Sequence, residues 1–374
     1  MKNTTLLAAS LAVGATGAYA GGMDRSGMSI APLFETGTYV ELSFGSVNPD
    51  VSGSFAASVP LIGGISSGDL TPSYTQLSAA YKRDLSENLS MAIILDQPFG
   101  ADVDYPDGTG YVYQGSNASV ETTGVTAVLR YKFNDRFSVH GGVRNLTSKG
   151  TVEIPIVGPR GYTMETSTEN DWGYLIGAAY EIPDIALRAS LTYNSAIDID
   201  FTASEDFSGG TAAANKSPLS VTMPQSVNFD FQTGIAADTL LMFSARWAEW
   251  TETVIAPQLY SSPSFVNDNL VDHNDDTISY SLGVGRRFND KLSGSLSVGY
   301  EKSYGGLQGN LSPRDGYKSI TAGLKYQITE QTAISGGVSY VWVGDAKTTY
   351  APSINPSFED NTAIGVGLKL SHHF

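Results

Sequence analysis

The last segment of the chain, IGVGLKLSHHF, alternates apolar residues with small or polar ones. Successive side chains of a β-strand point to opposite faces, so one face of this segment is apolar and the other is small and polar. The apolar face carries Ile364, Val366, Leu368, Leu370 and Phe374. The pattern predicts a strand, and by itself it leaves open whether the apolar face meets a protein core or lipid.

The same alternation recurs in VTAVLRYKF (125–133), ALRASLTYN (186–194), SGSLSVGY (293–300) and ITAGLKYQI (320–328), and no segment shows a sustained helical period. Short polar turns are predicted at 84–88, 134–136, 183–184, 236–238, 289–290 and 329–331. Longer connections are predicted at 49–72, 97–118, 150–169, 202–224, 253–274, 304–313 and 345–360. Because short and long connections alternate without exception, the pattern predicts fourteen antiparallel strands.

This asymmetry is typical of bacterial outer-membrane barrels, which have short periplasmic turns, longer outer loops and an even number of strands. A β-propeller would need a blade repeat, and none is visible. A two-domain sandwich would need a linker, and no shift in composition marks one. We therefore predict an all-β fold, a transmembrane antiparallel β-barrel of about 14 strands with a short N-terminal plug segment. A large secreted β-protein is the remaining alternative.

The charged residues support this interpretation. A Lys or Arg facing lipid near the bilayer centre costs about 2–4 kcal/mol, so charges within strands should face the lumen. In most strands they lie opposite the apolar residues, and the predicted lumen charges are Glu41, Arg130, Lys132, Arg144, Arg188, Asp230, Arg246, Glu301, Lys325 and Lys369.

The N-terminus predicts export of the protein, and the composition limits its possible partners. Lys2, an apolar run and the sequence AYA ending at Ala20 predict a signal peptide over residues 1–20, followed by a plug segment over 21–37 and the barrel over 38–374. The chain has no Cys, and its net charge is −16. No basic stripe is available for phosphates, which argues against a nucleic-acid partner. Mean hydropathy alone would indicate a soluble protein.

Several hairpins in sequence order are similar to the FadL/TodX family of outer-membrane transporters for long-chain fatty acids and other hydrophobic compounds. The strongest similarity is MPQSVNFDFQTGIAADTLLMFSARWAEWTE (223–252), with Trp247 and Trp250 in its second strand. The similarity extends from about Tyr39 to Phe374 and implies a fourteen-stranded, monomeric barrel. Family members carry a longer N-terminal hatch with Asn-Pro-Ala, whereas this chain has only Ala31-Pro32 without a preceding Asn.

Three groups of residues are candidates for the transport path. Pro98, Phe99 and Gly100 end the third strand, where the resemblance implies a kink that opens the wall sideways. The alternative is that Pro98 simply starts the outer loop. Glu41, Arg130, Arg144, Arg188, Asp230 and Arg246 could bind an anionic headgroup or pair with one another. Phe55, Leu61 and Ile62 lie in an unusually apolar first outer loop, which either captures ligands or packs on its neighbours.

Other residues have structural interpretations. Trp247 and Trp250 are assigned to the aromatic girdle of the barrel rather than to a ligand site. The acidic segment 267–276 lacks the spacing of a calcium loop, so no metal site and no cofactor are expected. The four histidines have no nucleophile signature around them, so an enzyme is not expected.

These observations predict passive transport of hydrophobic compounds, long-chain fatty acids first, across the bacterial outer membrane. The expected partners are these small molecules together with outer-membrane lipid and lipopolysaccharide. A general diffusion porin for small polar solutes is the alternative, because the plug is short, and a structural or adhesive barrel is a third.

Overall fold

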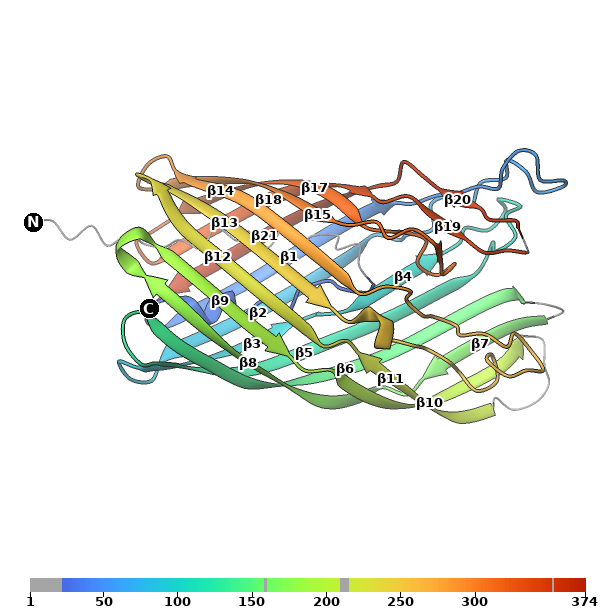
Figure 1. Cartoon of the computed structure of the whole chain (residues 1–374), viewed down its shortest axis with the longest axis horizontal. Helices are drawn as coiled ribbons and strands as arrows, with labels where there is room; N and C mark the ends of the chain where they lie inside the picture. The colour runs from blue at the N-terminus through green and yellow to red at the C-terminus, as the bar shows by residue number, and fades with distance from the viewer. Residues whose placement is uncertain (1–21, 158–159, 209–214, 352) are drawn as a thin grey trace, which may run out of the picture.

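The computed structural model describes residues 22–157, 160–208, 215–351 and 353–374, which form a closed antiparallel β-barrel (Figure 1). The predicted signal peptide, residues 1–20, lies outside the described residues. Among the residues described, no helix is long and apolar enough to cross a membrane.

Within the described ranges, fourteen strands form the wall, and four of them are interrupted into two segments each. The continuous strands are β1 (Tyr39–Asp50), β2 (Tyr74–Asp84), β5 (Asn117–Lys132), β6 (Phe137–Val157), β13 (Thr239–Ala248), β14 (Thr277–Arg287), β15 (Leu292–Glu301), β17 (Tyr317–Gln327), β18 (Thr332–Val343) and β21 (Thr362–His373). The interrupted strands are β3 (Leu89–Asp96) with β4 (Gly100–Asp104), β7 (Arg160–Thr166) with β8 (Glu169–Ile182), β9 (Leu187–Asn194) with β10 (Ile197–Ser208), and β11 (Asn215–Met223) with β12 (Ser226–Ala236).

The connections carry little further regular structure. The outer loops hold a small sheet of β16 (Leu307–Gln308), β19 (Ala346–Thr348) and β20 (Ser357–Phe358). Three short 3-10 helices complete the described elements: η1 (Ala31–Phe34), η2 (Pro183–Ile185) and η3 (Trp250–Glu252).

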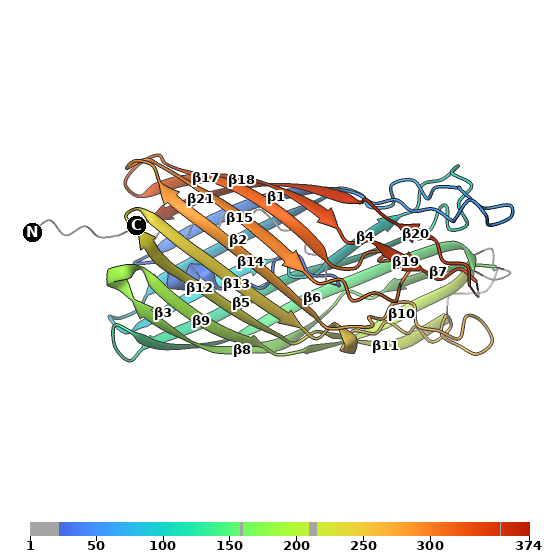
Figure 2. The same cartoon turned by 45° about the horizontal axis from the view of Figure 1, so that its top comes forward.

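The barrel closes through its first and last strands. β1 pairs with β21 from Tyr39↔His373 to Asp50↔Thr362, so neither strand leaves an open edge. The short turns lie at the end of the barrel that holds the C-terminus, and the long connections lie at the opposite end (Figure 2). The all-β, fourteen-stranded barrel expected from the sequence is therefore confirmed.

The outward and inward faces of the wall also follow the predicted parity. In β15, Leu296, Val298 and Tyr300 are exposed on the outside, and Leu296 keeps 54 % of its surface accessible. In β21 the exposed apolar residues are Ile364, Val366, Leu368 and Leu370. Lys369 and Ser371 are buried on the lumen side. The outer surface is thus an apolar band suited to lipid.

This orientation gives a direct test in β15. Leu296→Arg places a cation in lipid and should cost about 2–4 kcal/mol, so we expect impaired assembly in a folding assay with lipid vesicles. Ser295→Arg is the matched control, because Ser295 lines the lumen and a cation there remains hydrated. Equal assembly of the two variants would contradict the orientation of this strand.

The polarity of the wall reverses toward the outer end. Leu191 of β9 and Ile199 of β10 have the same parity, but Leu191 faces lipid and Ile199 is fully buried inside. The interruption at residues 195–196 exchanges the two faces, as a one-residue slip in a strand does. The same exchange separates β3 from β4, β8 from β7, and β12 from β11.

This reversal corrects two predicted connections. Residues 150–169 and 202–224 are mainly strand, because the β6–β7 and β10–β11 hairpins extend beyond the lipid. There the outer face meets water and the inner face is apolar. Inward residues such as Ile199 and Val221 pack against loop residues including Tyr260 and Leu270.

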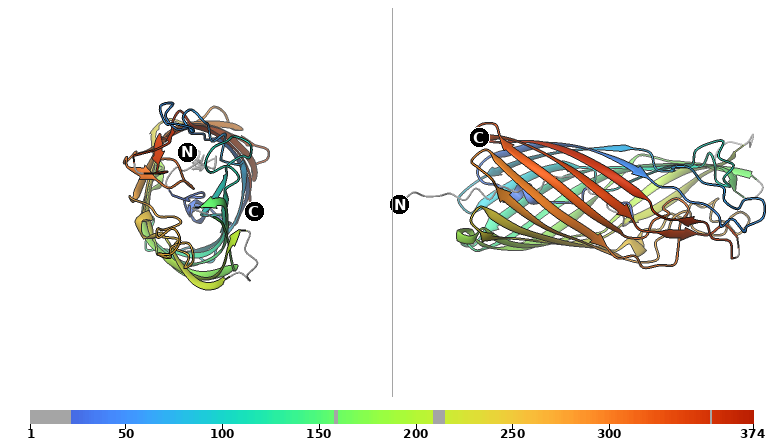
Figure 3. Two further views of the ribbon diagram at one scale, coloured as in Figure 1. Left: turned by 90° about the vertical axis from the view of Figure 1, so that its right-hand side faces the viewer. Right: turned by 90° about the horizontal axis from the view of Figure 1, so that it is seen from above.

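The N-terminal segment lies inside the barrel, as seen along the barrel axis in the left view of Figure 3. Helix η1 packs against β2, β3 and β5. Its Leu33 is fully buried, in a cluster with Ile30, Ala92 and Val128. The short segment therefore occupies one side of the lumen, where apolar lumen residues receive it.

Candidate functional site: the wall gap and the lumen plug

The third wall strand is broken at Gln97, Pro98 and Phe99, between β3 and β4. β3 pairs with β2 as far as Leu95↔Ala79, and β4 pairs with β5. Within the described residues no ladder joins β4 to β2, so residues 74–78 of β2 pair only with β1. The wall therefore has a gap between the outer half of β2 and β4, which is defined here as the wall gap.

Pro98 and its neighbours form the inner edge of the wall gap. Pro98 has no N–H to offer a ladder partner, and its side chain lies at the break. The Leu77 N–H instead donates to Oε1 of Gln97 at 3.0 Å. Leu77 and its cross-strand partner Phe44 are both exposed on the outside, so the gap begins at the level of lipid-facing side chains.

The N-terminal segment satisfies the backbone groups freed at this break. Asp24 and Phe99 form an antiparallel bridge. The Arg25 N–H donates to the Pro98 carbonyl at 2.8 Å, and the Gly100 N–H donates to the Met23 carbonyl at 2.8 Å. The bend is thus supported from inside by residues 23–26.

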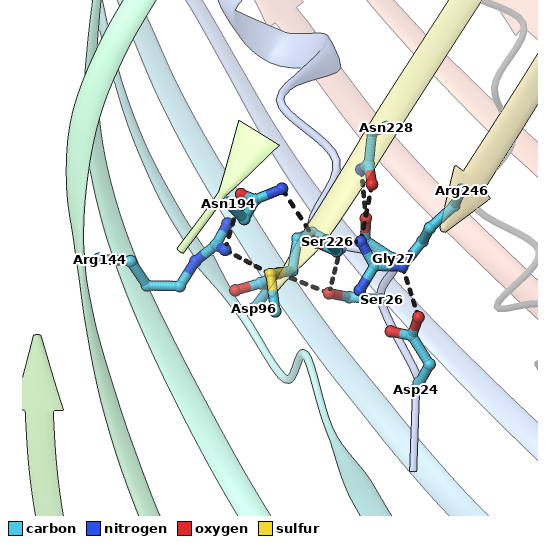
Figure 4. A network of polar contacts seen from close by, with 10 residues as sticks. Asp24, Ser26, Gly27, Asp96, Arg144, Asn194, Ser226, Asn228 and Arg246 are labelled. Atoms are coloured by element: carbon cyan, nitrogen blue, oxygen red, sulfur yellow. Dashed lines mark hydrogen bonds and ion pairs between the residues drawn. The ribbon is translucent and has the colours of Figure 1, made fainter. Parts of the chain in front are cut away.

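Side chains of the wall fasten this segment in the lumen (Figure 4). Arg246 of β13 donates from Nε to Asp24 at 2.5 Å, and both side chains are buried. Arg246 Nη1 also donates to Asn228 Oδ1 at 2.7 Å, and Asn228 Nδ2 donates to the Gly27 carbonyl at 2.8 Å. The Ser26 hydroxyl donates to Asp96 at 2.6 Å. We call residues 22–28 the lumen plug.

Two further lumen charges predicted from sequence, Arg144 and Arg130, are also paired within the protein. Arg144 donates to Thr126 at 2.8 Å and to Asn194 at 3.2 Å, and it contacts Met28 of the lumen plug. Arg130 forms an ion pair with Glu181. Its guanidinium and that of Arg188 lie over the Phe34 ring, at 4.6 and 4.5 Å from the centroid.

The two acids among the candidates for the transport path, Glu41 and Asp230, lie lower in the barrel. Glu41 pairs with Lys369 at 3.4 Å and accepts the Tyr39 hydroxyl at 2.6 Å. Asp230 lines a cavity of about 420 Å³ in the lower lumen, together with Arg188 and Glu35. The structure therefore brings Arg144 and Arg246 to the lumen plug, and places Glu41, Arg130, Arg188 and Asp230 nearer the short turns.

A larger cavity, of about 1090 Å³, lies above the lumen plug at the outer end of the barrel. Its floor is Met23, Asp24 and Arg25, and it reaches the wall gap at Tyr74 and Gly100. Apolar side chains line much of the rest, among them Val103, Val120, Ile154, Ile255, Leu270 and Leu311. This is the outer cavity.

Tyrosines of the second outer loop close one side of the outer cavity. The rings of Tyr105 and Tyr111 stack with their centroids 5.8 Å apart, and Tyr113 contacts both. Burial is the main cause that raises the pKa of Tyr113 to about 12, and it raises those of Tyr105 and Tyr111 as well. These phenols stay neutral, so this side of the outer cavity is uncharged.

The first outer loop only partly resembles the apolar capture surface expected from its sequence. Phe55 is buried, packed on Tyr111 and Tyr350. Leu61 is fully exposed, and Ile62 is half-buried at the edge of the same cluster. Of the three predicted capture residues, Leu61 and Ile62 are accessible from outside, while Phe55 holds the loop together.

Trp250 has a different position from the one the sequence suggested. It is completely buried inside the barrel rather than in the aromatic girdle, in edge-to-face contact with Phe99 at 5.7 Å. A Cβ at Gly22, where φ is +51°, would lie 2.2 Å from the Trp250 ring, so only glycine fits there. The girdle assignment is wrong for Trp250 because this residue lies in η3, beyond the end of β13 at Ala248, whereas Trp247 remains in the wall strand.

His273 of the fifth outer loop lies against Trp250, with the ring centroids 5.3 Å apart. Burial, reinforced by the nearby Arg314, lowers the pKa of His273 to about 4, so the imidazole is neutral at pH 7. Arg314 itself donates to the Gly22 carbonyl at the start of the lumen plug. No group of three or more metal-ligating side chains occurs in the described part of the chain.

Sequence reasoning did not single out Arg25, Tyr74 or Asp102, which meet at the wall gap. The Arg25 guanidinium pairs with Asp102 at 2.6 Å and lies 4.0 Å from the centroid of the Tyr74 ring. The one available signal was the adjacent pair Asp24-Arg25 in a segment predicted to lie inside a barrel, where charges need partners.

Comparison with known proteins decides the family. A family model described as outer membrane protein transport protein (OMPP1/FadL/TodX) matches residues 38–371. The chain belongs to this family. The resemblance inferred from the hairpins is thereby confirmed, and membership in the OMPP1/FadL/TodX family places this barrel in the outer membrane as a transport protein. Among curated proteins, the sequence comparison finds no match.

Solved structures share the fold at low sequence identity. A Pseudomonas aeruginosa FadL homologue superposes with a TM-score of 0.74 and 14 % identity, covering 91 % of each chain. The P. putida toluene transporter TodX gives 0.64 and 14 %, covering 90 % of each chain. The Ralstonia pickettii toluene transporter TbuX gives 0.62 and 14 %, covering 91 % of this chain and 90 % of its own.

Proposed function

We propose that this protein carries hydrophobic compounds passively across the outer membrane, by capture in the outer cavity and sideways release through the wall gap into the membrane. The observation that supports this most strongly is the unpaired stretch of β2 opposite β4, at the level of lipid-facing Phe44 and Leu77. A wall strand loses its ladder partner at a cost, so such a break in a barrel is a feature with a function.

The structure of the gap explains how such a route persists in a membrane. An unsatisfied backbone group in hydrocarbon costs several kcal/mol, which would close an ordinary gap. Here the lumen plug accepts and donates the missing hydrogen bonds at Pro98 and Gly100, and Gln97 covers the Leu77 N–H. The bend is therefore stable without a ladder between β2 and β4.

The chemistry of the two cavities favours a hydrophobic ligand and the sideways route. The outer cavity is lined by apolar and aromatic side chains together with charged ones such as Asp24 and Arg314, and it reaches the wall gap. Below the lumen plug, the path continues through a cavity lined by many serine side chains and by charges such as Asp230 and Arg188. This lower cavity also reaches the wall gap, at Leu77 and Gln97. An apolar molecule gains more by entering hydrocarbon there than by remaining beside these charges and hydroxyl groups.

The ligand proposed first is a long-chain fatty acid, and a monoaromatic hydrocarbon is the second. The family includes FadL-type proteins, and the similar TodX and TbuX structures are described as toluene transporters. Because Arg130, Arg144 and Arg246 have partners within the protein, none of them is reserved for a carboxylate, and the site does not exclude an uncharged ligand.

The decisive experiment compares three solutes with the purified barrel in liposomes. We expect accelerated uptake of labelled palmitate, of toluene, or of both, and little swelling driven by arabinose. Swelling by arabinose without hydrophobic uptake would instead support the alternative of a general diffusion porin.

A further inference from the structure

The side chain of Arg25 lies in the wall gap. Its guanidinium is paired with Asp102 of β4 at 2.6 Å and lies over the ring of Tyr74 of β2 at 4.0 Å. It thereby contacts both strands that border the gap. The side chain is 9 % exposed, so it fills the space rather than projecting into solvent.

Gly100 is explained by this arrangement. A Cβ at position 100 would lie 2.5–2.6 Å from Cζ, Nε and Nη1 of Arg25, which is closer than atoms can approach. Gly100 has no positive φ that would itself require glycine. The glycine is therefore needed for the close approach of the guanidinium, and the wall at this point is built around Arg25.

Arg25 also separates the two cavities of the barrel. Among the described residues, it alone lines both the outer cavity and the cavity of the lower lumen. Its backbone is held by the bond to Pro98, and the preceding Asp24 is held by Arg246. The backbone of residues 24 and 25 is thus held in place, and the Arg25 side chain lies between the two cavities.

The lower cavity is suited to water and small polar solutes on the side opposite η1. Strands β13, β14, β15 and β17 present hydroxyl groups there, from Ser244, Ser281, Ser295, Ser297, Ser319 and Thr321. Such side chains are short and hydrogen-bond with water, so they leave both room and hydration for a polar path.

We propose that Arg25 determines the route of transport. It separates the outer cavity from a hydroxyl-lined lower lumen that would otherwise conduct small polar solutes and ions, and it borders the wall gap. This inference rests on the proposed function, because it explains how the barrel stays closed to polar solutes while a hydrophobic ligand leaves sideways.

The test measures conductance and hydrophobic uptake separately on the full-length barrel. Arg25→Ala removes the partition, so we expect a several-fold rise in ion conductance across planar bilayers and in arabinose-driven liposome swelling over the nearly silent wild type. Arg136→Ala, at an exposed periplasmic turn, is the matched control and should behave as wild type. Heat-modifiable migration on gels verifies that each variant is folded.

Asp102→Asn is the second variant, because it weakens the hold on the guanidinium without removing it. It should raise conductance less than Arg25→Ala does. If the Arg25→Ala barrel does not insert into the bilayer, the conductance of Asp102→Asn provides the test. Wild-type conductance in the folded variants, or high conductance already in wild type, would overturn the role of Arg25. A wild type that takes up neither palmitate nor toluene would overturn the proposed function and leave the conductance result unaffected.

Discussion

A disulfide between positions 24 and 99 should abolish hydrophobic uptake, and reduction should restore it. Asp24 and Phe99 face each other in an antiparallel bridge whose flanking residues make the hydrogen bonds. Cα atoms in such a non-hydrogen-bonded pair lie about 4.5 Å apart, within the range that a disulfide spans. Because residues 23–26 fill the inner side of the wall gap, a ligand can leave sideways only if this segment moves.

The chain contains no cysteine, so Asp24→Cys with Phe99→Cys introduces a single disulfide and no competing pairs. The reduced form of the same variant is the matched control, since it carries the same substitutions. Uptake of labelled palmitate and toluene would be measured before and after reduction in liposomes. Equal uptake in the oxidised and reduced forms would show that the lumen plug stays in place during transport.

Arg246→Ala should have the largest effect on stability, about 3–5 kcal/mol, because it leaves Asp24 as an unpaired charge in a buried site. The Arg246–Asp24 pair is 2.5 Å long, with side chains 8 % and 7 % exposed. Denaturant unfolding of the refolded barrel gives the free energy, and protease cleavage near residue 24 reports release of the lumen plug.

Arg287→Ala is the comparison, because Arg287 forms an ion pair with Asp238 that is exposed at a short turn. Exposed pairs of this kind contribute about 0–1 kcal/mol. Adding Asp24→Ala to Arg246→Ala should recover part of the loss, since it removes the stranded charge. Similar costs for Arg246→Ala and Arg287→Ala would contradict the view that Arg246 anchors the plug.

The sequence predicted the membrane-embedded part of the wall because lipid imposes a simple rule there. Leu296 and Leu370 face lipid, whereas Ser295 and Lys369 face the lumen, and the alternation is readable from one strand at a time. The break at Pro98 was less readable, because a missing amide fits the start of an outer loop as well as a kink within a wall strand, and only the family resemblance favoured the kink. The sequence did not show what packs against the break, because nothing local indicates that Asp24 and Arg25 lie against residues 98–102.

The outer third of the barrel was less predictable for a physical reason. Once a strand leaves the membrane, its outer face meets water, so the rule that assigns apolar residues to the outside reverses. Ile199 and Val221 continue the apolar alternation of their strands, but short interruptions turn them inward. Segments 150–169 and 202–224 therefore resembled connections although they are mostly wall.

The sequence by itself determined the fold class, the strand count, the lipid-facing parity and the family. The parity depends on the periodicity of single segments, which the solvent on the two faces dictates, and the strand count and family depend on the order of those segments along the chain. Only the tertiary structure decided that Arg144 and Arg246 hold the plug, that Trp250 is buried, and that Arg25 lies between Tyr74 and Asp102. These are contacts across a lumen between residues far apart in the chain, and a buried charge selects its partner by position in space, which no local pattern encodes.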